Sequence, residues 1–145
     1  MDIGIFPGGL VPDIPADLPI RLQRGNGQWG ALHIATKHGH WLKKQGLDVH
    51  EMVWHKLRQR GAIYTTEENG KLKISLRISP AALVVLRLIS SGAEVFMTVV
   101  SVYFHPKALD GTKLAEYKPA EGLPAGDRKL VYPLYSLPPS SGDGM

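Results

Sequence analysis

The chain has 145 residues, of which 43% are hydrophobic and 21% charged, enough for one domain with a core of its own. It has no cysteine, which excludes disulfides and thiolate zinc sites, and no unbroken apolar run of about 18 residues, which excludes an obvious membrane span. The net charge of +4 is unevenly spread, because residues 21–60 hold eight Lys and Arg against two acids. The positive potential of such a segment attracts polyanions and phosphates.

Residues 1–20 carry four prolines and three aspartates. Prolines at this density predict an extended arm or a series of turns. The segment lacks the basic and then apolar pattern of a secretory signal. We therefore expect a cytoplasmic site of action, with another device responsible for any delivery into a target cell.

Two helices are expected next. Residues 31–38 read as a short helix ended by Gly39. Residues 49–60 read as a longer one, because Asp48 is a good N-cap, Glu51 completes a capping box and Gly61 supplies a stop.

After Gly61 the hydrophobic period changes to two, which predicts strands at residues 62–66, 71–79, 81–89 and 94–104. Along the last strand, strict alternation places six residues on one face: Val95, Met97, Val99, Ser101, Tyr103 and His105.

Residues 106–145 are rich in proline and glycine and predict a tail, with one edge strand at residues 130–135. The expected fold is a single α+β domain over residues 1–145. Two N-terminal helices would pack on a four-stranded antiparallel meander in a core of residues 21–105, between the arm of residues 1–20 and the tail.

Three histidines, His33, His38 and His40, lie close together in GALHIATKHGHW. On a regular helix His33 and His38 point about 140° apart, so they do not share a metal ion. HEMVWH on the second helix has one residue too many for the HExxH zinc motif. We expect no metal and no cofactor.

Acid–base chemistry on a phosphodiester suits these residues better. Cleavage of RNA by its own 2′-hydroxyl needs a base, an acid and groups that stabilise the phosphate oxygens. Histidine serves as either acid or base near neutral pH, and Lys37 lies beside His38. The polar end of the last strand, at Ser101 and Tyr103, is the candidate opposite wall of a cleft.

The order of His33-Ile34, Lys37-His38, a second helix and a meander ending in Ser101-x-Tyr103 resembles the barnase–EndoU–colicin–RelE superfamily of metal-independent endoribonucleases. The resemblance covers about residues 21–105 and is nearest to the phage and polymorphic-toxin branches. It implies an RNase, often acting on tRNA, that leaves a 2′,3′-cyclic phosphate. In toxin members a cognate immunity protein is a partner.

By position, the resemblance implies that His33 and His38 are the acid–base pair, that Lys37 stabilises the phosphate, and that two strand hydroxyls position the substrate. Further candidates for substrate contacts are Arg77, Arg87, Lys73 and His40. RNA, with tRNA among the candidates, is the expected partner, a membrane is not, and the oligomeric state stays open. The alternative function is a non-catalytic interaction module, such as a phage structural or accessory protein with a basic binding face.

Overall fold

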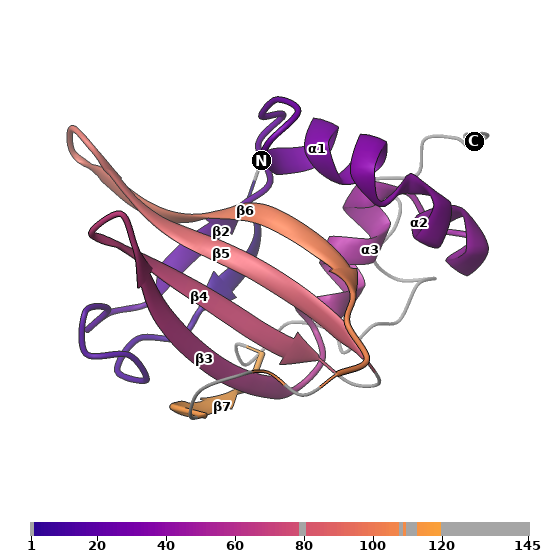
Figure 1. Ribbon diagram of the computed structural model, residues 1–145. Coiled ribbons are helices and arrows are strands. Elements are labelled where there is room, and N and C mark those ends of the chain that lie inside the picture. Colours follow the sequence, from indigo (N-terminus) through magenta and orange to yellow (C-terminus); the bar gives the residue numbers. More distant parts are fainter. Residues whose placement is uncertain (1, 79–80, 108, 110–112, 120–145) are drawn as a thin grey trace.

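The computed structural model describes residues 2–78, 81–107, 109 and 113–119, which form three helices and seven strands (Figure 1). The helices are α1 (Gly30–Lys37), α2 (Gly39–Gln45) and α3 (Val49–Lys56). The strands are β1 (Asp2–Phe6), β2 (Leu18–Arg21), β3 (Gly61–Glu68), β4 (Lys71–Ile78), β5 (Ala82–Ser91), β6 (Glu94–Phe104) and β7 (Ala115–Tyr117).

The strands form one mixed, curled sheet in the order β1-β2-β6-β5-β4-β3-β7. Neighbouring strands are antiparallel except β2 and β6, which are parallel. The predicted α+β fold, with two helices on a four-stranded meander, is therefore wrong: the protein is mostly sheet, shaped as a half-barrel with three short helices within the described residues.

The N-terminal segment is part of the sheet and not the predicted arm. Phe6 of β1 and Ile20 of β2 are fully buried, and β2 continues the sheet by pairing with β6 at Met97. The prolines concealed these strands because they lie at strand limits or in very short strands: Pro7 directly follows β1, and Pro19 lies in the four-residue β2. Burial of apolar side chains from both strands offsets their low intrinsic propensity.

The predicted longer helix is present as α3, and its capping box is complete. The Asp48 carboxylate accepts from the Glu51 backbone N–H at 2.8 Å, and the Glu51 carboxylate accepts from the Asp48 N–H at 3.0 Å. The helix ends earlier than predicted because Gly61 is not its stop; it is the first residue of β3. A Cβ there would lie 2.5 Å from the carbonyl oxygen of Arg77, so close pairing with β4 requires glycine.

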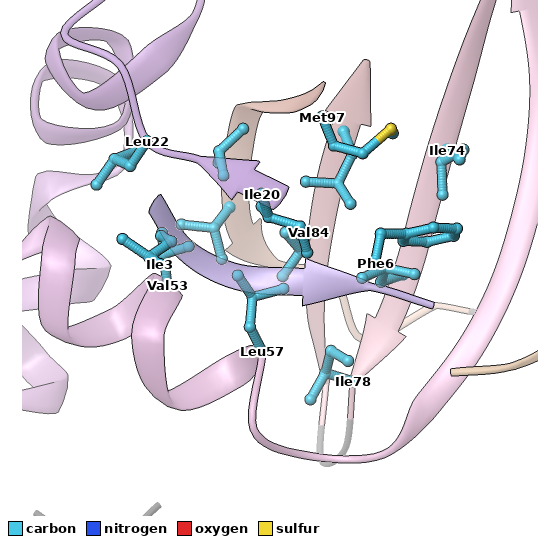
Figure 2. Packing of buried hydrophobic residues seen from close by; sticks show 14 of the residues in the cluster. Ile3, Phe6, Ile20, Leu22, Val53, Leu57, Ile74, Ile78, Val84 and Met97 are labelled. Atoms are coloured by element: carbon cyan, nitrogen blue, oxygen red, sulfur yellow. The ribbon is translucent and has the colours of Figure 1, made fainter. Parts of the chain in front are cut away.

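The sheet curls far enough to bring its two edge strands together across the core. Phe6 of β1 stacks on Tyr117 of β7 with ring centroids 6.4 Å apart, and the Tyr117 hydroxyl donates to the carbonyl oxygen of Leu57 at 2.5 Å. Figure 2 shows Leu57 and Phe6 packed among side chains of the surrounding strands. The enclosed core is continuous and holds Ile74, Val84 and Met97.

An extra residue in β6 divides that strand into two faces. Val85 pairs with Ser101 and Leu86 pairs with Val99, so Val100 is a β-bulge without a partner in β5. Val99 points into the core, whereas Ser101 lies on the opposite face. The prediction that residues 95–105 alternate without interruption is therefore wrong, because a bulge shifts all later side chains to the other side of the sheet.

We call the face turned away from the core the outer face. Residues directly paired across antiparallel strands share a face, so the register defines its rows. One row holds Arg77, Leu83 and Tyr103, and another holds Lys73, Arg87 and Thr98.

Candidate functional site

Four aromatic side chains from two parts of the chain form a continuous group at the end of β6. The ring of His38 stacks on Tyr103 with centroids 5.0 Å apart and planes at 19°. The edge of His33 meets His38 at 5.5 Å, and His105 meets Tyr103 at 6.0 Å, both nearly perpendicular. We call His33, His38, Tyr103 and His105 the His–Tyr cluster. All four are half-buried.

The cluster forms because helical geometry stops just before His38. α1 ends at Lys37, and His38, with φ −118° and ψ 14°, connects α1 to α2. The 140° separation expected on one continuous helix therefore does not apply to His33 and His38, whose rings are in contact. Gly39 is the first residue of α2, not the end of a single helix. α1 packs along β6 (Figure 1), which brings His38 onto Tyr103, with His33 against the other side of the contact at His38.

His33 is oriented by the loop that precedes α1. Its Nδ1 lies 3.0 Å from the carbonyl oxygen of Gly27. A carbonyl only accepts hydrogen bonds, so Nδ1 carries the proton and Nε2 is the atom available for chemistry. Nε2 accepts a proton when the ring is neutral and donates one when the ring is charged.

The surroundings of His38 favour its neutral form. Burial lowers its pKa below the usual 6.5, and the positive charges of His33 and Lys37 lower this pKa further. Burial also raises the pKa of Tyr103, so its hydroxyl stays protonated at neutral pH and can donate a hydrogen bond. The cluster thus pairs an imidazole suited to accept a proton with a phenol suited to donate a hydrogen bond.

The other predicted catalytic residues have different positions. Lys37, the last residue of α1, is exposed beside His38. Ser101 is 6% exposed, and its hydroxyl has no hydrogen-bond partner among the described residues. Its side chain lies on the same face as Tyr103 but is covered. His40, predicted to contact substrate, is exposed on α2.

The three predicted cationic residues of the sheet share the outer face but differ in role. Arg77 donates through Nη1 to the carbonyl oxygen of Lys107 and through Nη2 to that of Pro106 at 3.3 Å. These bonds fix the segment that carries His105. Lys73 and Arg87 are half-buried neighbours in the row that ends at Thr98.

His105 is the member of the cluster that the sequence did not single out. It is the first residue after β6, and its backbone N–H donates to the carbonyl oxygen of Ala81 at 2.7 Å. Alternation with Tyr103 was the available signal, since both residues follow the bulge at Val100. This alternation points to His105 as a site residue only once His38 is known to lie on the same face of the sheet as Tyr103.

Comparison of the chain with protein-family models, curated proteins and solved structures gives no match. In the described part of the chain, no group of three or more His, Asp or Glu side chains is placed to hold a metal ion. No helix there is long and apolar enough to cross a bilayer.

Proposed function

We propose that the protein is a metal-independent endoribonuclease, with tRNA as a candidate substrate and the His–Tyr cluster as its active site. The supporting observation is the contact of His38 with both His33 and Tyr103, at 5.5 and 5.0 Å between ring centroids. This arrangement combines two imidazoles and a phenol beside an exposed lysine. These groups match the base, acid and oxygen-stabilising donors that 2′-hydroxyl attack on a phosphodiester requires.

In the proposed reaction His38 is the base, because its lowered pKa leaves it neutral and able to accept a proton. It takes the proton of the 2′-hydroxyl as the 2′-oxygen bonds to phosphorus. The bond from phosphorus to the 5′-oxygen breaks, and Nε2 of a protonated His33 donates a proton to that leaving oxygen. Lys37 and the Tyr103 hydroxyl stabilise the non-bridging oxygens, and the product ends in a 2′,3′-cyclic phosphate.

The test is incubation of purified protein with total tRNA in EDTA. We expect discrete fragments, and we expect His33→Ala and His38→Ala each to reduce the rate by about 10²- to 10⁴-fold, the usual worth of a general acid or base. His50→Ala removes an imidazole from α3 and is the matched control. Parallel purification of all variants controls for contaminating RNase.

A model oligonucleotide sharpens the test. Replacing the ribose at the mapped cleavage position with 2′-deoxyribose removes the attacking hydroxyl and should abolish cleavage there. Intact RNA at high protein excess, with any co-purified inhibitor removed by denaturation and refolding, would sink the proposal.

A second candidate is an interaction module that binds RNA or another partner on the basic outer face without cutting. The covered position of Ser101 favours it, because a predicted substrate hydroxyl is not accessible. Retention of intact RNA by the wild type, weakened by added salt and unaffected by His38→Ala, would support this candidate.

A further inference from the structure

A second feature of the outer face lies near the other end of β6. It is a cavity of about 360 Å³, within the range of small-ligand sites. Two aromatic residues line it, Trp29 from the loop before α1 and Phe96 from β6. The remaining lining is mixed, with guanidinium, carboxylate, amide and hydroxyl groups beside apolar side chains.

The cavity has a prepared planar surface. The guanidinium of Arg21 lies 4.3 Å from the centroid of the Phe96 ring. Two carboxylates hold it there: Asp2 accepts from Nε at 2.7 Å, and Glu94 accepts from Nη2 at 3.1 Å. Because Asp2 and Glu94 offset the charge of Arg21, its guanidinium presents a flat surface suited to a planar ring. Arg87, the second guanidinium of the lining, adds a positive charge beside it.

A hydrogen-bonding group borders the same cavity. The Thr98 hydroxyl donates to the Gln23 side-chain oxygen at 2.7 Å. This bond fixes the carboxamide and leaves its NH₂ group as a donor. A carbonyl oxygen or ring nitrogen on the edge of a heterocycle is the acceptor that such a donor fits.

We propose that this cavity binds a nucleobase, stacked on the Trp29 indole and on the Arg21 guanidinium, which covers the buried Phe96 ring, and hydrogen-bonded to Gln23. As a subsite of the nuclease this rests on the proposed function, because the base would belong to a nucleotide near the scissile phosphate. The binding itself does not depend on cleavage.

The position of the cavity relative to the His–Tyr cluster supports this assignment. Trp29 directly precedes α1, and His33 follows one helical turn later, about 6 Å along the axis. Along β6, Thr98 and Tyr103 pair with Arg87 and Leu83, which lie four positions apart on β5, about 13 Å along the strand. A short single-stranded segment spans this separation, with a base in the cavity and a phosphate at the cluster.

The test is an NMR titration of the full chain with the four ribonucleoside 3′-monophosphates, using ribose 5-phosphate and inorganic phosphate as controls without a base. Assignment of the Trp29 indole N–H by Trp29→Phe separates it from the other two tryptophans. We expect nucleotides, but not the controls, to shift the signals of the Trp29 indole and the Gln23 carboxamide.

Gln23→Ala should weaken nucleotide binding about tenfold, whereas Gln28→Ala, an exposed glutamine in the same loop outside the cavity lining, should leave it unchanged. Binding should persist in the His33→Ala, His38→Ala double variant. Absence of these shifts at millimolar nucleotide would overturn the base site even if RNA is cleaved. Shifts without any cleavage would keep the base site and reject the nuclease.

Discussion

The imidazole of His38 lies nearly parallel to the ring of Tyr103, with 19° between the planes and 5.0 Å between centroids. One residue comes from the junction of two helices and the other from the last long strand, 65 positions later in the sequence. The stack partly removes both groups from water. The same contact thus positions His38 and changes its proton affinity.

The pKa of His38 should respond to Lys37. Burial is the main cause of its lowered pKa, and Lys37 adds to the effect. Lys37→Gln removes a positive charge and should raise the pKa of His38 toward 6.5 without fully restoring it. The measurement is NMR titration of the histidine Cε1–H signals. Lys44→Gln on α2 is the charge-matched control, and an equal upward shift in that variant would contradict a local effect.

Stability should decline in acid partly through His38. A pKa lower in the folded than in the unfolded state means that the unfolded chain binds more protons as pH falls below about 6.5. His38 therefore contributes stability above that pH, and this contribution is lost as pH falls through its folded pKa. Urea unfolding of wild type and His38→Gln at several pH values should show a weaker pH dependence in the variant. Parallel pH profiles would contradict the shift.

Tyr103→Phe should distinguish the contribution of the Tyr103 hydroxyl from that of its ring. The phenyl ring preserves the stack on His38, so the fold and the His38 titration should change little. In the proposed RNA cleavage, loss of this donor to the phosphate oxygens should lower kcat by about a hundredfold, in line with removal of a transition-state hydrogen bond. Tyr103→Ala should in addition move the His38 pKa upward by exposing the ring. Full activity in Tyr103→Phe would exclude the hydroxyl from the reaction.

Ser101→Ala should be neutral or stabilising. The buried hydroxyl has no partner among the described residues, so it carries a desolvation cost without a compensating hydrogen bond. We expect the free energy of unfolding to rise by up to about 1 kcal/mol, measured in urea. A loss of stability of similar size would indicate a hydrogen bond to this hydroxyl in solution.

Gly61→Ala should be strongly destabilising. The new methyl group would meet the Arg77 carbonyl oxygen at 2.5 Å, and moving the paired backbones of β3 and β4 costs about 1–3 kcal/mol. Gly39→Ala is the control, because a Cβ there has open space and alanine favours the helix, adding about 0.5–1 kcal/mol. Equal effects of the two substitutions on urea unfolding would contradict this packing argument.

Local signals in the sequence identified several elements correctly. The Asp48 capping box predicts the start of α3, and the apolar alternation after residue 70 predicts β4. β6 spans the predicted residues 94–104. These features depend on neighbouring residues, because capping and strand alternation act over a few positions. The predicted strand at residues 130–135 lies outside the described residues.

Long-range pairing produced the features that the sequence did not reveal. β1 gains stability by pairing with β2, and β2 by pairing with β6, and this gain outweighs the proline signals that predicted an arm. β7 exists by pairing with β3, with Tyr117 buried against Phe6. No local pattern encodes these contacts, since even the paired residues of β1 and β2 lie 12 or more positions apart.

The sequence by itself determined which reactive groups are present: two closely spaced histidines, a lysine beside them, and a strand ending in Ser101-x-Tyr103. Only the tertiary structure decided which of these meet. The break after α1 turns His38 toward His33, and the bulge at Val100 moves Tyr103 from the core side of β6 to the outer face. Both depend on one residue leaving a regular repeat, and a single such departure redirects every side chain that follows.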